Sequence, residues 1–287
     1  MNYQAPLSLD AAVDILAGAS GECRVLAGGT DLLVRMHSDM VDPETVLDIK
    51  RIDGMRSITE EDGGWRIGAA VSGAQMGEYE ALSAAWPGVV EAAGLIGSTQ
   101  IQGRATMAGN LCNASPAADS VPAMVAAGAQ ARIVGPEGVR DVAVEDVPVS
   151  PGKTSLKPGE LVASIYLPAR PARTGDAYLR FIPRTEMDIA VVGCGICLTL
   201  DESGTCTAAR VALGAVAPTV ILVPEAAEAI IGTKLDDAAM QALAAAASAA
   251  AKPIDDKRGT AEYRVHMAGV LARRAAAIAK SRAEGAK

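Results

Sequence analysis

The sequence has 287 residues and a formal net charge of −8, which allows two domains and gives an acidic surface. An acidic surface repels phosphate backbones, so nucleic acid is not an expected partner. No basic and apolar leader precedes the first predicted helix, and the longest apolar stretch, 189–200, is too short to span a bilayer. We therefore expect a cytoplasmic protein without a transmembrane segment.

The first fifty residues alternate between predicted helix and strand. Ser8 is a suitable N-cap for a helix over 9–17, and 24–27 is a short strand that ends at a pair of glycines. A second helix over 32–38 leads to a strand over 45–48. A strand, a helix and a strand joined by a glycine turn predict a small parallel sheet.

From Trp65 onward the sequence predicts a mixed α+β region. The preceding Glu60-Glu-Asp62 leads into two glycines and is interpreted as a solvated turn. Turn sequences such as Gly135-Pro136 separate the predicted elements. The predicted strands are 65–69, 130–134, 139–144 and 161–167, and the predicted helices are 73–85, 89–96 and 120–127.

The segment from Pro168 to Gly175 is the predicted domain boundary, because two prolines and a glycine interrupt both periodicities. After it, three strands are predicted over 177–182, 188–200 and 206–215. Helices follow, among them an Ala-rich segment over 240–251, whose composition has strong helix propensity.

Five scattered cysteines fit a reducing compartment, since their number is odd. Cys194 and Cys197 form a Cys-x-x-Cys pair. Residues three apart on a strand point to opposite faces, however, so these two thiols do not chelate one metal. With only two histidines in the chain, no zinc or iron–sulfur site is predicted. Buried free thiols are the expected state of these cysteines.

Two loops rich in small residues are the candidate ligand-binding segments. In 25–31, two glycines follow a predicted strand, so the backbone can approach a ligand and free amides can hold a phosphate. In 104–119, small residues and side-chain hydrogen-bond partners suit a hydroxyl-rich ligand. A purely structural glycine turn and a long surface loop are the alternatives. Few acids, bases or nucleophiles accompany the two loops, which suits a cofactor whose own ring does the chemistry.

The two loops, in this order, also resemble a known pair of motifs. Leu26-Ala-Gly-Gly-Thr-Asp-Leu-Leu33 and Ala105-Thr-Met-Ala-Gly-Asn-Leu-Cys-Asn-Ala-Ser-Pro-Ala-Ala-Asp119 resemble the FAD-binding motifs of the medium subunit of the carbon monoxide dehydrogenase and xanthine dehydrogenase family. Asp255-Asp-Lys-Arg-Gly-Thr-Ala-Glu-Tyr-Arg264, followed by 268–274, resembles the C-terminal helix signature of that family. The resemblance therefore covers essentially the whole chain.

This resemblance implies an α+β chain in two parts. Residues 1–172 would form an FAD-binding domain of the vanillyl-alcohol-oxidase or PCMH type, with subdomains at about 1–55 and 56–172. Residues 173–287 would form a C-terminal domain with a three-stranded antiparallel sheet and helices.

The resemblance also implies cofactors and partners. In this family a large subunit carries the molybdopterin cofactor, a small iron–sulfur subunit carries 2Fe–2S clusters, and the medium subunit carries FAD. Substrate is hydroxylated at molybdenum, and electrons pass through the clusters to FAD and then to an external acceptor. A dimer of such heterotrimers is the expected assembly.

The first motif implies that the backbone amides of 27–31 hold the FAD pyrophosphate, with Thr30 adding a hydroxyl and Asp31 fixing the turn. The second motif covers 106–110, where the family usually has Gly-Gly-Asn and this sequence has Ala108-Gly-Asn. The extra methyl fits only if φ is negative at Ala108.

Three more residues acquire roles from the resemblance. Asp119 would accept hydrogen bonds from cofactor hydroxyls, Arg180 would contact the flavin, and Ile189 would cover the isoalloxazine. The expected cofactor-binding residues are Leu26, Ala27, Gly28, Gly29, Thr30, Asp31, Leu32, Thr106, Ala108, Gly109, Asn110, Ser115, Asp119, Leu161, Val162, Arg180 and Ile189.

Two other functions remain open at this point. A free-standing FAD-dependent oxidase or reductase would need a proton-transfer residue over the flavin, and the sequence offers no convincing candidate. A flavin-free scaffold would have no use for two intact cofactor loops. Purification separates the three classes, because a scaffold is colourless and an oxidase is a yellow protein that turns over a small substrate alone.

Overall fold

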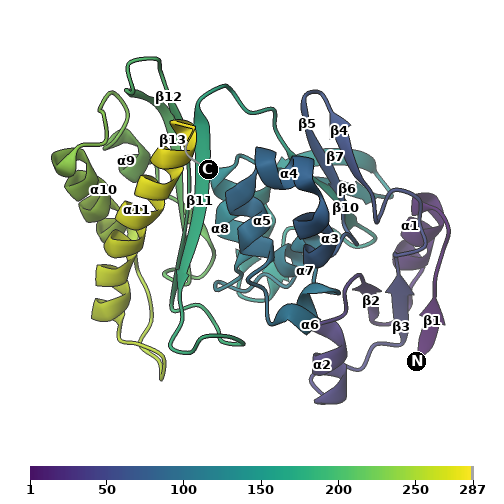
Figure 1. Cartoon of the computed structure of the whole chain (residues 1–287). Helices are drawn as coiled ribbons and strands as arrows, with labels where there is room; N and C mark the ends of the chain where they lie inside the picture. The colour runs from purple at the N-terminus through teal and green to yellow at the C-terminus, as the bar shows by residue number, and fades with distance from the viewer. Residues whose placement is uncertain (286–287) are drawn as a thin grey trace.

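The computed structural model describes residues 1–285, and it contains three main sheets (Figure 1). The first is a three-stranded parallel sheet in the order β1-β3-β2. Its elements are β1 (Asn2–Gln4), α1 (Leu9–Ala17), β2 (Cys23–Leu26), α2 (Leu32–His37) and β3 (Thr45–Asp48). The predicted parallel sheet and the Ser8 cap are confirmed, since Ser8 Oγ accepts a hydrogen bond from the Ala11 amide at 3.2 Å. The strand β1 was not predicted, because its sequence Asn-Tyr-Gln shows no alternation of apolar and polar residues.

The second sheet has five antiparallel strands in the order β4-β5-β10-β6-β7. Its strands are β4 (Ile58–Glu61), β5 (Gly64–Gly68), β6 (Gln130–Gly135), β7 (Gly138–Ala143) and β10 (Leu161–Leu167). The helices and short elements between them are α3 (Gly73–Glu78), α4 (Glu80–Ala85), α5 (Pro87–Ala93), α6 (Thr99–Gln102), α7 (Met107–Cys112), α8 (Ser120–Ala126), the 3-10 helix η1 (Val144–Asp146), β8 (Pro148–Ser150) and β9 (Lys153–Thr154).

Three predictions in this region were wrong in whole or in part. The predicted turn at 60–62 belongs largely to β4, whose residues pair with β5 through the backbone although only Ile58 is a large apolar residue. The predicted helix over 73–85 is interrupted at Tyr79, whose φ of −89° and ψ of 89° are not helical. The predicted helix over 89–96 ends earlier, at Ala93, because Gly94 provides its C-cap.

The third sheet is antiparallel and belongs to the C-terminal part of the chain. Its order is β11-β12-β13-β14, so it has four strands and not the predicted three. Its elements and the following helices are β11 (Thr174–Phe181), β12 (Val192–Leu200), β13 (Cys206–Gly214), β14 (Ile221–Leu222), α9 (Pro224–Glu228), α10 (Asp237–Ala250) and α11 (Ala261–Ala283). The additional strand, β14, has two residues and pairs only at its edge with β13, which explains why the sequence pattern did not indicate it.

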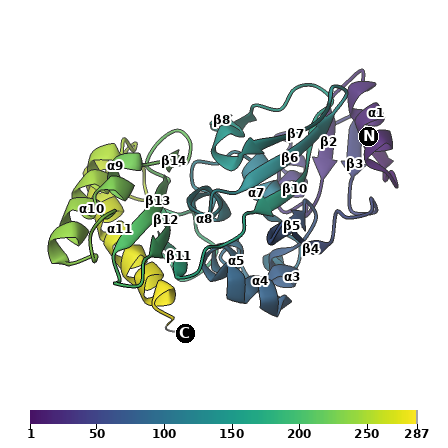
Figure 2. The ribbon, with the colours of Figure 1, turned by 90° about the horizontal axis from the view of Figure 1, so that it is seen from above.

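The third sheet lies between two helical layers (Figures 1 and 2). One face packs on α11, and the other packs on α8, so it joins the two parts of the chain. Cys194 and Cys197 point to these two faces as predicted: Cys194 is fully buried in the C-terminal core, and Cys197 packs against the core of the N-terminal part. At Gly195 a Cβ atom would lie 2.3 Å from the Pro122 carbonyl oxygen, so α8 approaches the sheet closely.

Candidate functional site

The first glycine loop connects β2 to α2 and needs its two glycines for different reasons. Gly29 has a φ of +81°, which side chains with a Cβ rarely adopt. Gly28 does not, but a Cβ there would lie 2.0 Å from the backbone carbonyl oxygen of Arg104. Gly29 therefore permits the turn, and Gly28 permits close contact with the second loop.

The loop exposes a row of amides. Within residues 1–285, the N–H groups of Gly28, Gly29, Thr30 and Asp31 donate no hydrogen bond to the chain itself. The start of the loop is fixed by Lys50, whose Nζ donates to the Ala27 carbonyl oxygen at 3.1 Å. Consecutive free amides in a turn form a concave donor set that suits an anionic oxygen group.

The second loop contains α7, which was not predicted. Thr106 is its N-cap, with φ −125° and ψ 150°, and its Oγ1 accepts a hydrogen bond from the Gly109 amide at 2.9 Å. Ala108 lies in the first turn of α7, outside the positive-φ residues, so its methyl causes no backbone strain. Asn110 holds the start of α8, since its Oδ1 accepts hydrogen bonds from the amide and hydroxyl of Ser120 at 3.1 and 2.7 Å.

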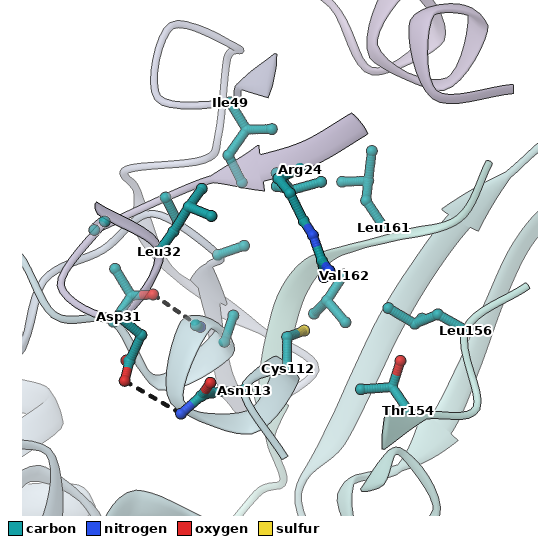
Figure 3. A pocket seen from close by; sticks show the side chains of 18 of the residues that line it. Arg24, Asp31, Leu32, Ile49, Cys112, Asn113, Thr154, Leu156, Leu161 and Val162 are labelled. Atoms are coloured by element: carbon teal, nitrogen blue, oxygen red, sulfur yellow. Dashed lines mark hydrogen bonds between the residues drawn. The ribbon is translucent and has the colours of Figure 1, made fainter. Parts of the chain in front are cut away.

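A side-chain hydrogen bond joins the two loops, in addition to the contact at Gly28. Asn113 Nδ2 donates to Asp31 Oδ1 at 3.2 Å, as Figure 3 shows. The Asp31 carboxylate is thereby held beside α7, and it forms no capping hydrogen bond with α2.

A cavity of about 600 Å³ opens between the two loops and the start of β10. Figure 3 shows Asp31 and Asn113 on one side of it and Leu156, Leu161 and Val162 on the other, so the cavity has a polar and an apolar part. The predicted site residues that line it are Ala27, Gly28, Gly29, Thr30, Asp31, Leu32, Thr106, Ala108, Gly109, Asn110, Leu161 and Val162. Its volume is in the range of small-molecule and cofactor sites.

Two ionisable side chains in the lining are unsuited to covalent or acid–base chemistry. Burial raises the pKa of the Cys112 thiol to about 12, so it remains protonated and poorly nucleophilic at neutral pH. Glu160 forms an ion pair with Arg140 at 2.8 Å, and this hydrogen-bonded partner lowers the pKa of the Glu160 carboxyl. Neither of these two side chains is therefore suited to act as a nucleophile or a general base in this cavity.

Five predicted site residues lie outside this lining. Leu26 is buried under Gly29, and Ser115 Oγ accepts a hydrogen bond from the Ala117 amide at 3.2 Å. The other three, Asp119, Arg180 and Ile189, belong to the junction with the C-terminal sheet.

Asp119 and Arg180 form a buried ion pair at this junction. Arg180 Nη1 lies 2.7 Å from Asp119 Oδ2, and the hydroxyl of Tyr178 donates to Asp119 Oδ1 at 3.2 Å. Only 8% of Asp119 is exposed, and this burial raises the pKa of its carboxyl while Arg180 and Tyr178 oppose the rise. Tyr178 was not predicted as a site residue, because its role depends on a partner 59 residues away.

Ile189 lies in the connection from β11 to β12 and is 50% exposed. The predicted strand over 188–200 was wrong at its start: β12 begins at Val192, because Met187 has a φ of +54° and Asp188 Oδ1 accepts the Ile189 amide at 2.8 Å. The C-terminal signature holds this connection. Arg264, which is 4% exposed, donates to the Val191 carbonyl oxygen at 2.8 Å.

The cavity also contains residues that the sequence analysis did not select. One group of them lies in the segment before β10, where Leu156, Lys157, Pro158 and Gly159 form part of the wall. The Lys-Pro-Gly turn before a buried strand was the available signal, since such a turn brings backbone close to the start of the strand.

No group of three or more His, Cys, Asp or Glu within 1–285 could hold a metal ion. Among the helices of the same residues, none combines the length and apolar character needed to cross a membrane.

Comparison with known proteins places the chain among flavoprotein subunits. Residues 1–170 match the family described as the FAD binding domain in molybdopterin dehydrogenase, and residues 177–279 match the CO dehydrogenase flavoprotein C-terminal domain. The carbon monoxide dehydrogenase medium chain of Afipia carboxidovorans is 35% identical over 283 residues, with 99% of this chain and 98% of that protein covered. The xanthine dehydrogenase FAD-binding subunit of Escherichia coli O157:H7 is 30% identical, with 99% and 97% covered.

The solved structures agree with the sequence relatives. A chain of a Cu,Mo-CO dehydrogenase crystal structure superposes with a TM-score of 0.93 at 36% identity, covering 98% of both chains. A chain of quinoline 2-oxidoreductase from Pseudomonas putida 86 has a TM-score of 0.90 at 25% identity, covering 99% of this chain and 98% of that one. The similarity therefore extends over both the glycine loops and the C-terminal sheet.

Proposed function

The chain belongs to the FAD-binding subunits of the molybdenum hydroxylase family, and we propose that it carries electrons between partner subunits and an external acceptor. In this proposal it binds one FAD without a covalent bond. The FAD supplies the redox chemistry, and the chain binds and orients it.

One observation carries the proposal: two glycine-containing loops face one cavity and present free backbone amides to it. The amides of 28–31, together with the hydroxyl of Thr30, would hold the pyrophosphate from one side. The amides of 107 and 108 in the first turn of α7 would hold it from the other side, because amides at the start of a helix lack helical partners and that of Gly109 already donates to Thr106. Gly29 permits the positive-φ turn and Gly28 the close contact with the second loop, and together they give these amides their positions.

The remaining predicted residues fit the two ends of an extended cofactor. Leu161 and Val162 give the cavity an apolar wall that suits the adenine ring. Asp119, Arg180 and Ile189 lie toward the C-terminal sheet, where the flavin end would extend. We assign Asp119 to the cofactor hydroxyls, Arg180 to the flavin and Ile189 to one face of the ring.

The electrons would come from a partner chain. We propose that 2Fe–2S clusters on a small subunit deliver them after substrate hydroxylation at the molybdopterin cofactor of a large subunit. The state of Cys112 and Glu160 supports this division of labour, since neither side chain is available as a nucleophile or a base at neutral pH. The unpaired cysteines support a reducing, cytoplasmic location.

The proposed assembly is a dimer of heterotrimers, following the general preference of oligomers for twofold symmetry. We further propose that the chain divides into domains at 1–172 and 173–287. The junction at Asp119 then lies between a cofactor domain and a domain that closes over the flavin end.

Flavin analysis of the purified chain tests cofactor binding directly. We expect a yellow protein with one FAD per chain, released completely by acid denaturation. Mass spectrometry of the denatured chain should find the unmodified polypeptide, because the Cys112 thiol is protonated. A colourless protein after incubation with FAD would contradict the proposal, and a flavin that stays attached after denaturation would refute the non-covalent mode.

A further inference from the structure

A second cavity, of about 280 Å³, lies on the same seam and shares only Ala27 and Gly28 with the large one. Its walls come from two segments of the N-terminal part of the chain, 27–56 and 70–104. The lining residues are Ala27, Gly28, Asp48, Lys50, Arg51, Arg56, Ala70, Ser72, Gln75, Gly103 and Arg104. Four of them are basic and one is acidic.

One basic residue and the acidic residue neutralise each other. Lys50 Nζ lies 2.8 Å from Asp48 Oδ1, and Asp48 Oδ2 also accepts a hydrogen bond from the Tyr3 hydroxyl at 2.6 Å. Lys50 also donates to the Ala27 carbonyl oxygen, so the charged groups of Lys50 and Asp48 are both occupied by contacts that fix the first glycine loop. They leave no negative charge in the lining for the arginines.

The other three basic residues have no partner. Arg51, Arg56 and Arg104 are exposed, and their side chains form no ion pair or hydrogen bond with residues 1–285. Arginines elsewhere in this acidic chain are commonly paired, as Arg132 is with Asp141 at 2.9 Å. Three guanidinium groups around one hollow repel one another, and a concave wall concentrates their field.

We propose that this second cavity is a binding site for a phosphate group, separate from the cofactor cleft. Each guanidinium offers a planar set of donors that matches the oxygens of phosphate, and a dianion would neutralise two of the three unpaired charges. The group could be inorganic phosphate or the phosphate of a small ester. The cavity volume is larger than one phosphate needs, so an ester with a small organic part also fits.

The position of the site suggests a consequence for the cofactor cleft. Arg51 follows β3 in the first sheet, whereas Arg104 precedes α7, and the Arg104 carbonyl is the group that Gly28 contacts. A phosphate bound by both arginines would link the segment after β3 to the second loop, which lines the large cavity. This consequence, unlike the site itself, rests on the proposed FAD binding, and by linkage phosphate would then strengthen FAD binding.

The experiment uses the full chain saturated with FAD, so that added phosphate does not enter the large cavity. Isothermal titration with inorganic phosphate should give saturable binding, weakened about tenfold in Arg51→Gln and in Arg104→Gln because each loses a charge-assisted contact. Arg51→Lys keeps the charge but loses the planar donor set, and should weaken binding less. Titration with a nucleoside monophosphate and with the nucleoside alone separates a phosphate ester from free phosphate as the preferred ligand.

Arg273→Gln is the matched control, since Arg273 is exposed on α11 and has no ion pair within the described residues. It should bind phosphate like the original protein. Absence of saturable binding, or equal binding by Arg51→Gln, Arg104→Gln and the control, would overturn the proposal. Tight binding of an acidic peptide without any binding of phosphate would overturn it as well. Normal flavin content in these failures would leave the proposed function intact.

Discussion

The first glycine loop and the Asp119 cluster are assigned to the same cofactor, but they are built differently. The loop consists of consecutive residues between β2 and α2, and its geometry depends on two missing side chains. In the cluster, Asp119 meets Tyr178 and Arg180 across 59 and 61 residues of sequence. The cluster exists only because α8 packs against the C-terminal sheet.

This difference separates binding from stability. A substitution in the loop changes what the cavity can accept, while most core contacts remain. A substitution among the long-range charged contacts leaves buried groups without partners and therefore costs folding free energy as well. The following variants test whether the two regions respond in these two ways.

The largest effect on binding is expected for Gly29→Val. The branched side chain would be strained at a φ of +81°, and its Cβ would lie only 2.9 Å from Leu26 and 3.2 Å from Leu33, so the loop and its free amides would have to shift. We expect loss of FAD from the purified protein, with a folded chain by circular dichroism. Gly54→Val is the matched control, because Gly54 has the same φ and a Cβ there would contact nothing within 4 Å. Normal flavin content in Gly29→Val would show that the first loop does not hold the pyrophosphate.

The largest effect on stability is expected for Arg264→Met. The substitution removes the donors to the Val191 and Ala215 carbonyl oxygens and the partner of Asp256. Asp256 is exposed, so the main cost is that of leaving two backbone carbonyl oxygens without their donor, about 3 kcal/mol in total. Urea unfolding should report this loss, whereas Arg273→Met, at an exposed position of the same helix, should change stability by less than about 0.5 kcal/mol. Equal stabilities of the two variants would show that Arg264 in the C-terminal signature does not stabilise the fold.

An intermediate effect is expected for the Asp119–Arg180 pair. Unfolding of Asp119→Asn, Arg180→Met and the double variant should give a coupling free energy of about 1–3 kcal/mol. The single Arg180→Met variant should be the least stable, since it leaves the Asp119 carboxyl, whose pKa burial raises, without its cation. Strictly additive effects would mean that the two side chains do not act as a pair.

The smallest effect is expected at Asp188, and it depends on pH. Hydrogen bonds from Arg184 and the Ile189 amide, with Arg258 nearby, lower the pKa of Asp188 in the folded chain. A lowered pKa stabilises the fold above the unfolded value of about 3.9, and this contribution is lost as pH falls through the folded pKa. Asp188→Asn should therefore lower the melting temperature slightly at pH 7 and not at pH 2–3, roughly.

Asp53→Asn, at an exposed position outside the ion pairs of the described residues, provides the control for Asp188→Asn. It should leave the melting temperature unchanged at both pH values. A deficit of Asp188→Asn that persists undiminished in acid would mean that its charge is not what holds the Ile189 connection.

The sequence was most informative where structure is local. Gly28 and Gly29 follow a short apolar strand, so both the parallel sheet and the loop could be predicted from neighbouring residues. The contacts of the Asp119 cluster were harder to predict, because Tyr178 acquires its partner only through the packing of α8 on β12 and β13. The resemblance to a known family supplied Asp119 and Arg180, but not the fact that they form an ion pair.

The errors in secondary structure have the same origin. Ile189 continues an apolar run into β12, yet the hydrogen bond from its own amide to Asp188 keeps it in the connection. In β4 and β14, strand formation depends on backbone pairing with a neighbouring strand and not on an apolar pattern. Such pairing is a property of the folded chain, so the pattern of one short segment does not reveal it.

Flavin reduction by candidate substrates, with and without partner subunits, tests the central claim most directly. The visible absorbance of oxidised FAD should be followed in the FAD-loaded chain alone, and then after addition of an iron–sulfur and a molybdopterin subunit. Substrate should bleach the flavin only in the assembled complex, because in the proposed function the chain takes its electrons from a partner. Rapid bleaching by substrate in the isolated chain would contradict the electron-carrier function and indicate an oxidase.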